Sequence, residues 1–234
     1  MQHPSPRPVI IIGAGRHGIL LAEKMLVDSG TELLGFLDSN PRAVLPRFLT
    51  DKGLGILGGD DVLGRYADRA DFIVALGANL MPARRRLIDS MTGLGARGAT
   101  YVQPTAYVAP TSVLGHGVVV LPHAVVNTGA SIGDHTCINT ASVVEHDCRV
   151  GANAFVQPRA VLGGSVSLGD NSVLGIGAAV RDGMSIGCRT LVGGGAMVAA
   201  DIPDDSLAYG TPARVVGPSP WADAPLPPFR DVTT

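Results

Sequence analysis

An aliphatic residue returns at every sixth position through the middle and C-terminal parts of the chain. The seventeen leading residues are Val102, Val108, Leu114, Val120, Val126, Ile132, Ile138, Val144, Val150, Val156, Leu162, Leu168, Leu174, Val180, Ile186, Val192 and Val198. Four residues after the leader, thirteen of the seventeen positions hold Ala, Ser, Thr or Cys. A helix repeats about every 3.6 residues and a flat strand every second residue, so neither fits this period. The pattern predicts a solenoid of short strands joined by tight corners.

Each hexapeptide is predicted to form one side of a parallel β-helix, with its leader pointing into a narrow apolar core. Three hexapeptides would complete one coil, and successive coils would pair strand on strand. Glycine follows the leader at eight positions, namely Gly115, Gly133, Gly151, Gly163, Gly169, Gly175, Gly187 and Gly193. At these positions we expect corners that need either a positive φ or a close approach of the backbone.

A different pattern precedes the solenoid and predicts a strand, a glycine turn and a helix. The apolar run Val9–Ile12 is followed by Gly13, Gly15 and Gly18 in a GxGxxG arrangement, and the helix should run to about Asp28. This arrangement in this context is typical of a nucleotide-binding α/β unit. Simple packing of a strand on a helix explains the glycines equally well.

Further apolar runs extend the predicted parallel α/β domain. Leu33–Leu37 ends in Asp38, at the place where a Rossmann unit contacts a ribose. Strands are also expected at Gly55–Leu57 and Phe72–Leu76, and a following helix carries Arg84–Arg86. These arginines could contact a pyrophosphate, but a solvated helix face is the more common explanation and the one we expect. Because only about ninety residues precede the solenoid, one nucleotide fits better than a dinucleotide.

Composition narrows the possible classes of function. The 234 residues are 46% hydrophobic and 4% aromatic with a formal net charge of -2, so a nucleic-acid-binding surface is not expected. The three cysteines stand apart without a CxxC spacing, which argues against a disulfide framework or a structural zinc site. The N-terminal segment fits neither a signal peptide nor a membrane span. We expect a soluble, cytoplasmic protein of two domains.

One polar cluster on the predicted solenoid suggests chemistry. His146 follows the leader Val144 by two residues, an outward position, and lies between Glu145 and Asp147. A neutral imidazole accepts a proton near pH 7, and a carboxylate bonded to its other nitrogen fixes the tautomer, so His146 is a candidate general base. Gly164 would lie one coil further on, about 4.8 Å away, where its N–H could face an oxyanion. A surface histidine with incidental acidic neighbours is the alternative.

Three other histidines are weighed as metal ligands, because some β-helix enzymes bind zinc between subunits. His116 and His135 share a predicted face but differ in phase, whereas His123 and His146 fall on the other two faces. A stacked ligand set is therefore not evident, and we expect no metal.

The motifs of both parts together resemble those of one known family. They comprise Gly13-Ala14-Gly15-Arg16-His17-Gly18, Phe36-Leu37-Asp38, Ile138-Asn139-Thr140, Glu145-His146-Asp147 and Tyr209-Gly210-Thr211-Pro212-Ala213-Arg214. The chain resembles the bacterial sugar O/N-acyltransferases, which include acetyltransferases of a UDP-linked bacillosamine precursor and of GDP-perosamine, and the sialic acid O-acetyltransferases. The likeness covers nearly all of residues 8–216. Hexapeptides alone would indicate only the acyltransferase superfamily, whereas the small N-terminal domain joined to an EHD motif is more specific.

This resemblance implies an architecture. Residues 8–98 would form a small Rossmann-like domain for a nucleotide-linked sugar, and residues 99–216 a left-handed β-helix acyltransferase domain. Beyond the likeness, the composition of residues 217–234 indicates a Pro-rich tail, either disordered or packed on a neighbouring subunit. The resemblance also implies a homotrimer with active sites between adjacent subunits. Acetyl-CoA, the acyl donor, would lie along the solenoid.

The family's site residues match positions of this chain. The histidine matching His146 deprotonates the acceptor amine, the acid matching Asp147 orients it, and Asn139 matches an asparagine beside the site. The other matches are Gly13, Gly15, His17 and Asp38 for the substrate and Gly164, Phe155, Gly210 and Pro212 for acetyl-CoA. In the family, the counterpart of His17 reaches toward the sugar, that of Asp38 lies near the nucleotide base, and the amide of the Gly164 counterpart meets the thioester carbonyl.

One position departs from the family pattern. The bacillosamine-type enzymes carry a second histidine nine residues after the base, in contact with the acetyl group, and this chain has Phe155 there. A phenylalanine cannot donate that hydrogen bond. Either backbone groups suffice for the oxyanion, or the acyl group differs from acetyl.

The resemblance thus implies an acetyl-CoA-dependent N-acetyltransferase of polysaccharide biosynthesis. It would act by direct transfer on the amino group of a UDP-, GDP- or dTDP-linked 4-amino-deoxy sugar. O-acetylation of a sialic acid is the alternative within the enzyme class. A non-catalytic solenoid that binds a nucleotide sugar and a zinc-dependent hydratase of the same fold are the remaining alternatives.

Overall fold

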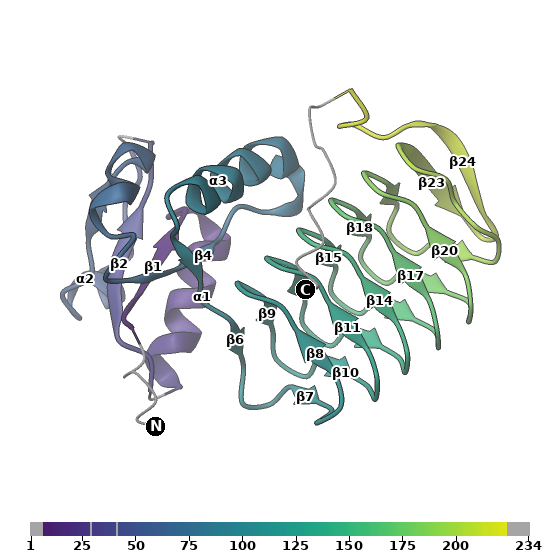
Figure 1. Ribbon diagram of the computed structural model, residues 1–234, viewed down its shortest axis with the longest axis horizontal. Helices are drawn as coiled ribbons and strands as arrows, with labels where there is room; N and C mark the ends of the chain where they lie inside the picture. Colours follow the sequence, from purple (N-terminus) through teal and green to yellow (C-terminus); the bar gives the residue numbers. More distant parts are fainter. Residues whose placement is uncertain (1–6, 29, 41, 224–234) are drawn as a thin grey trace. The chain divides into compact units, whose positions relative to one another are not determined.

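Two compact units make up the chain, Met1–Ala99 and Thr100–Thr234 (Figure 1). The computed structural model describes residues 7–28, 30–40 and 42–223. Within these residues, no helix has the length and apolar character needed to cross a membrane.

The N-terminal unit is built on a parallel sheet with the strand order β3-β2-β1-β4-β5. Its strands are β1 (Val9–Ile12), β2 (Leu33–Leu37), β3 (Ile56–Gly58), β4 (Asp71–Val74) and β5 (Arg97–Gly98). Its helices are α1 (Arg16–Val27), α2 (Arg47–Thr50) and α3 (Met81–Gly93), with short 3-10 helices η1 (Asp60–Arg65) and η2 (Ala78–Leu80). The strand order reverses at β1, so the carboxyl ends of β1 and its neighbours border the crevice where α/β folds bind ligands.

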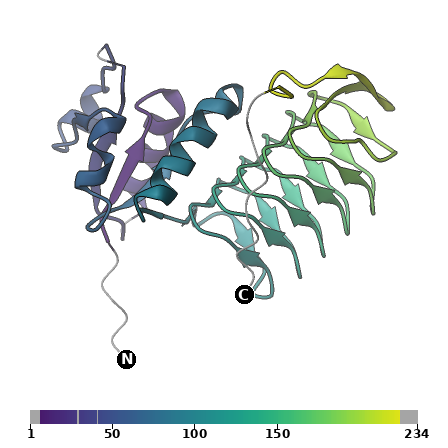
Figure 2. The ribbon, with the colours of Figure 1, turned by 45° about the horizontal axis from the view of Figure 1, so that its top comes forward.

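The C-terminal unit is the predicted solenoid, a left-handed β-helix whose coils stack in sequence order (Figure 2). Each two-residue strand pairs with the strand eighteen residues further on, as Val126 does with Val144. One sheet contains β6 (Tyr101–Val102), β9 (Val119–Val120), β12 (Cys137–Ile138), β15 (Phe155–Val156), β18 (Val173–Leu174) and β21 (Leu191–Val192). The second contains β7 (Tyr107–Val108), β10 (Val125–Val126), β13 (Val143–Val144), β16 (Val161–Leu162), β19 (Ala179–Val180) and β22 (Met197–Val198). The third contains β8 (Val113–Leu114), β11 (Ser131–Ile132), β14 (Arg149–Val150), β17 (Ser167–Leu168) and β20 (Ser185–Ile186).

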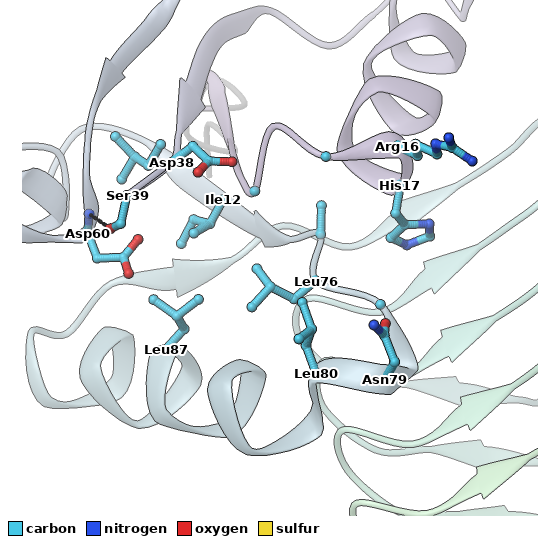
Figure 3. A pocket seen from close by; sticks show the side chains of 15 residues that line it. Ile12, Arg16, His17, Asp38, Ser39, Asp60, Leu76, Asn79, Leu80 and Leu87 are labelled. Carbon is cyan, nitrogen blue, oxygen red and sulfur yellow. Dashed lines mark hydrogen bonds between the residues drawn. The ribbon is translucent and has the colours of Figure 1, made fainter. Parts of the chain in front are cut away.

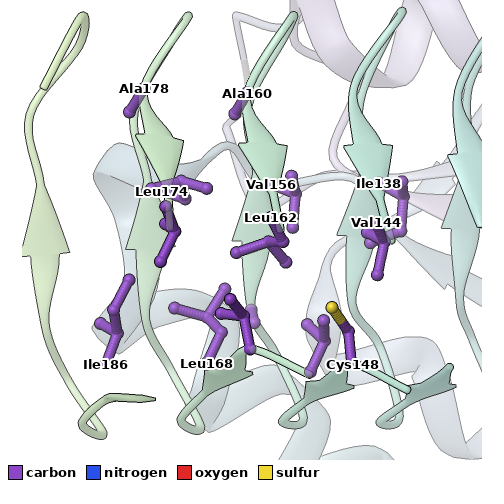
Figure 4. Close-up of a cluster of buried hydrophobic side chains, with 14 of the residues drawn as sticks. Ile138, Val144, Cys148, Val156, Ala160, Leu162, Leu168, Leu174, Ala178 and Ile186 are labelled. Atoms are coloured by element: carbon purple, nitrogen blue, oxygen red, sulfur yellow. The ribbon is translucent and has the colours of Figure 1, made fainter. Parts of the chain in front are cut away.

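The leading residues fill the interior of the β-helix (Figure 4). Val144, Leu162 and Val180 stack in successive coils of one sheet and are at most 3% exposed. Small buried residues such as Ala160 and Ala178 occupy the corners between the leaders. Fully burying a Val or Leu side chain contributes roughly 1.5–3 kcal/mol. The stacked leaders therefore hold together a unit whose strands are only two residues long.

Two backbone features turn the corners. From Gly117 to Gly195, the residue three positions after each leader adopts a positive φ and need not be glycine, as Asp147 and Ser165 show, both with φ 59°. The glycines directly after the leader lack a positive φ. At Gly151 a Cβ would stand 2.6 Å from the backbone nitrogen of Asp170, and at Gly169 one would stand 2.5 Å from that of Cys188. Close approach of the next coil explains these glycines, and a positive φ is the wrong explanation for them.

An antiparallel hairpin closes the first sheet at its C-terminal end. β23 (Ser206–Gly210) pairs with β21 on one side and with β24 (Ala213–Pro218) on the other. The chain stays packed beyond β24, because Ser219 donates its N–H to the Asp205 carbonyl at 2.7 Å and Trp221 is 7% exposed. The rest of the predicted tail, from residue 224, lies outside the described residues.

Candidate active site

A pocket of about 580 Å³ opens at the carboxyl ends of β1, β2 and β4 (Figure 3). The glycine loop after β1, the start of α1 and the loop between β4 and η2 form its walls. His17 and Asn79 lie at one end of the pocket and Asp38 at the other. The structure therefore gathers the predicted substrate residues Gly13, Gly15, His17 and Asp38 around one cavity.

The glycines of the loop after β1 meet different requirements. Gly13 has φ +105°, which disfavours any side chain. A Cβ on Gly18 would overlap the carbonyl oxygen of Gly13, so α1 can pack on β1 only with glycine there. Gly15 is the N-cap of α1, and a Cβ on it would meet no atom within 4 Å. A helix N-terminus beside an open glycine favours a phosphate.

Asp38 ties this loop to the end of β2. Its Oδ2 accepts the Ala14 N–H at 2.7 Å, and its Oδ1 accepts the Asn40 N–H at 2.7 Å. Each carboxylate oxygen of Asp38 thus already accepts one backbone hydrogen bond. A further contact to a nucleotide would use the remaining lone pairs.

A buried arginine lies near His17. Arg84 is 2% exposed, and its Nη1 donates to the carbonyl of Val74 and, at 3.2 Å, to that of Leu76. Burial, and secondarily the charge of Arg84, lowers the pKa of His17 to about 4. His17 is therefore neutral at pH 7 and can accept as well as donate a hydrogen bond.

The solvated face expected for the arginines of α3 is wrong for two of the three. Arg84 and Arg85 are buried, and only Arg86 is exposed. The guanidinium of Arg84 instead donates to the carbonyl groups of Val74, the last residue of β4, and of Leu76 just after it. Arg85 bonds Asp89 at 2.8 Å on the same helix.

His146 lies at the corner between β13 and β14. Its Nδ1 is 2.9 Å from Oδ2 of Asp147, and the positive φ of Asp147 turns the carboxylate back toward the ring. The hydrogen bond to Asp147 is the main cause that raises the pKa of His146; partial desolvation opposes it, and the charges of Asp147, Glu145 and Asp182 add to it. With Nδ1 held by the carboxylate, Nε2 is left to face an acceptor.

Glu145 is fixed beside the histidine. Its Oε2 accepts a hydrogen bond from Nδ2 of Asn127 at 2.9 Å and one from the His146 N–H at 3.3 Å. Asn127 lies one coil before Glu145, eighteen residues earlier in the chain. Together with Asp147 and Asp182, Glu145 adds negative charge near the imidazole and favours its protonated form.

Gly164 lies one coil after His146, as predicted. A Cβ on Gly164 would stand 2.6 Å from Nε2 of His146 and 2.7 Å from its Cε1, so the ring rests against this glycine. The Gly164 N–H donates to Oδ1 of Asp182 at 3.0 Å. This donor, expected to face an oxyanion, is therefore already engaged by a carboxylate.

Two other predicted site residues lie away from the His146 corner. Asn139 follows β12 at the preceding corner, where its Nδ2 is 3.7 Å from Sγ of Cys137. Phe155 lies on β15, pairs in register with Cys137 and Val173, and is 1% exposed. A single chain does not bring Asn139 or Phe155 to His146.

The predicted CoA-tail residues lie at the far end of the β-helix. Gly210 ends β23 and Pro212 follows it in the hairpin turn before β24. The ring of Tyr209 fills the space beside Gly193, where a Cβ would overlap it. Gly210 has φ +101°, which suits glycine at this turn.

Within the described part of the chain, no three His, Cys, Asp or Glu side chains converge as metal ligands. His116 and His135 do lie on successive coils, where the His135 N–H donates to the His116 carbonyl at 2.8 Å. His135 is 7% exposed, with its ring beside Gly117.

Comparison with known proteins decides the family. Residues 8–91 match the family model of the PglD N-terminal domain. PerB from Caulobacter crescentus, in complex with CoA and GDP-perosamine, is 34% identical with a TM-score of 0.80, over 90% of this chain and 97% of that one. The chain belongs to the bacterial sugar N-acetyltransferases.

Two further solved structures resemble the chain. The acetyltransferase domain of PglB from Neisseria gonorrhoeae FA1090, in complex with acetyl coenzyme A, is 31% identical with a TM-score of 0.82, over 90% of this chain and 100% of that one. WeeI from Acinetobacter baumannii AYE, at 20% identity with a TM-score of 0.70 over 89% of this chain and 99% of that one, shows the fold alone. The predicted family and fold class are confirmed.

Three residues of these sites escaped the sequence reasoning: Asn127, Asp182 and Arg84. Asn127 is one coil from Glu145, and Asp182 is one coil from Gly164. The eighteen-residue stacking points to both, because Asn127 precedes Glu145 by eighteen residues and Asp182 follows Gly164 by eighteen. No comparable periodic signal marks Arg84.

Proposed function

We propose that the protein transfers the acetyl group of acetyl-CoA to the amino group of a nucleotide-linked 4-amino-deoxy sugar. The observation that carries the proposal is the His146–Asp147 pair at a corner of the β-helix, in a chain that matches PerB over nearly its whole length. PerB is described with CoA and GDP-perosamine, and the PglB domain with acetyl coenzyme A. Because acetyl-CoA and nucleotide sugars are cytoplasmic metabolites, we place the reaction in the cytoplasm.

In this mechanism His146 is the general base. Asp147 holds Nδ1, so Nε2 takes a proton from the amine as its nitrogen attacks the thioester carbonyl. The tetrahedral oxyanion then collapses, the C–S bond breaks, and CoA leaves as the thiolate, which can take up the proton held by His146. Asp147 stabilises the imidazolium that forms between these steps.

The charge around His146 favours an amine over an anionic acceptor. Glu145, Asp147 and Asp182 place three carboxylates near the ring. An amino sugar is largely an ammonium ion in solution, and this field attracts it, whereas the field repels the carboxylate of a sialic acid. The ammonium ion releases one proton to solvent before the attack, and Nε2 takes the second as the nitrogen attacks. The site therefore supports N-acetylation over the O-acetylation of a sialic acid.

The pocket of the N-terminal unit is the proposed site for the nucleotide. Gly13 and Gly15 at the start of α1 would receive the diphosphate. Asp38 would lie near the base and His17, at the opposite end of the cavity, near the sugar. The neutral state of His17 suits a hydrogen bond to a sugar hydroxyl.

We further propose a homotrimer with the active site between subunits. Asn139 and Phe155 lie away from His146 within one chain, so a second chain would have to supply them. Gly164, Gly210 and Pro212 would contact acetyl-CoA along the solenoid. An acyl oxygen would share the Gly164 N–H with Asp182, and Phe155 adds no donor.

The test is release of CoA from acetyl-CoA with a panel of UDP-, GDP- and dTDP-linked 4-amino sugars and CMP-sialic acid. His146→Ala serves as the control variant. Turnover of an amino sugar that is lost in this variant supports the reaction and the base. Turnover of CMP-sialic acid alone contradicts N-acetylation. If CoA neither binds nor raises the melting temperature, a non-catalytic solenoid replaces the enzyme.

A further inference from the structure

The carboxylate of Asp182 links the two coils that follow the coil of His146. Oδ1 of Asp182 accepts the Gly164 N–H at 3.0 Å. A Cβ on the preceding Gly163 would overlap that oxygen, so the link requires glycine at this position. Asp182, Gly164 and His146 occupy the same phase of three successive coils.

The same link recurs at a second corner of the β-helix, away from His146. Asp134 accepts the His116 N–H at 2.7 Å, Asp170 accepts the Ala152 N–H at 2.7 Å, and Asp204 accepts the Cys188 N–H at 2.8 Å. Each of these links passes a glycine one residue before the donor: Gly115, Gly151 and Gly187. The carboxylate link is therefore a repeated feature of the β-helix, and it joins one coil to the next.

At Asp182 the fixed corner carries the proposed general base. The His146 ring rests on Gly164, with 2.6 Å between Nε2 and the place a Cβ would take. A shift of Gly164 by a few tenths of an ångström would change the direction in which Nε2 points. Catalytic groups tolerate little misplacement, since about 1 Å can cost about a hundredfold in rate.

We propose that Asp182 is a positioning residue for His146: its carboxylate holds the Gly163–Gly164 corner on which the imidazole rests. The inference rests on the proposed function of His146. Asp182 acts on His146 through the backbone of Gly163 and Gly164 and does not contact the substrate.

The test compares Asp182→Ala, Asp182→Asn and Asp134→Ala. The last variant removes the same kind of link over Gly115, away from the site. We expect Asp182→Ala to lower kcat about tenfold while KM for acetyl-CoA changes little. Asp182→Asn keeps an acceptor oxygen and should restore most of the rate, and Asp134→Ala should match the wild type in kcat while losing similar thermal stability.

Three results would overturn the proposal. A wild-type kcat in Asp182→Ala means that the link does not position the base. A higher kcat means that Asp182 competes with the acyl oxygen for the Gly164 N–H. An Asp182→Asn variant as slow as Asp182→Ala assigns the effect to charge rather than to the hydrogen bond.

The ring signals of His146 can be measured without turnover, so they test the positioning role separately from the proposed function. In histidine-labelled protein at a pH where His146 is neutral, the ring signals assigned by His146→Ala should move in Asp182→Ala. They should stay in place in Asp182→Asn and Asp134→Ala. If the wild type turns over no acceptor, the proposed function fails, whereas unmoved His146 signals in Asp182→Ala refute the positioning role.

Discussion

The imidazole of His146 rests on Gly164, its neighbour one coil along the β-helix. The place of a missing Cβ on Gly164 lies 2.6 Å from Nε2 and 3.3 Å from Cδ2 of that ring. Gly164 thus leaves room for the ring and limits its position from one side. Asp147 holds the other ring nitrogen, Nδ1, at 2.9 Å.

Gly164→Ala should disable the base without unfolding the protein. Gly164 lacks a positive φ, so alanine fits the backbone, and the imidazole is what must move. We expect kcat/KM to fall about tenfold to a hundredfold with a small change in Tm. Gly217→Ala, where a Cβ would meet no atom within 4 Å, is the control. Equal rates in the two variants would contradict the contact.

Asp147→Asn should shift the pH dependence of the reaction. His146 accepts a proton only when neutral, so kcat/KM rises as pH increases through its pKa. Asp147 raises that pKa, chiefly through its hydrogen bond. Its loss should move the rising limb to lower pH and lower the plateau by part of the roughly 10²–10⁴-fold that a general base supplies. If the rising limb of the profile of kcat/KM against pH stays in place, a group other than His146 controls the rate.

His17 should make the stability of the protein depend on pH in the acid range. The unfolded imidazole takes up a proton near pH 6.5, whereas the folded one resists until about pH 4. Its contribution to stability is therefore complete above pH 6.5 and is lost as pH falls toward 4. His17→Gln should show a smaller loss of Tm between pH 6.5 and 4 than the wild type. Parallel Tm curves would mean that the folded and unfolded pKa values coincide.

The two residues of β16 should lose very different amounts of stability on truncation. Leu162 is 0% exposed inside the coil, and Leu162→Ala should lower the free energy of unfolding by about 2–5 kcal/mol. Val161 points outward and is 37% exposed, so Val161→Ala should cost only about 0.5 kcal/mol. Chemical denaturation of both variants measures the difference. Similar losses would contradict the inward direction of the leaders.

Prediction from the sequence succeeded for the β-helix, where the same six-residue pattern repeats along the chain. The aliphatic leaders alternate with outward residues on two-residue strands, so their period alone placed Val144 and Leu162 inside. The same phase placed Gly164 one coil after His146. Prediction from the sequence failed for α3, because three consecutive arginines do not reveal which of them faces the carbonyl groups at the end of β4. Arg84 is buried there, contrary to expectation.

Local spacing was enough to predict the solenoid, the α/β unit before it and the neighbouring His146 and Asp147. The eighteen-residue period brings Asp182 next to Gly164, but it does not give the direction of the Asp182 side chain, so the hydrogen bond from the Gly164 N–H to that carboxylate is known only from the folded structure. The folded structure also separated Asn139 from His146, because a coil turns a corner between them. The period determines which residues share a face, but the stacking of coils determines which atoms meet.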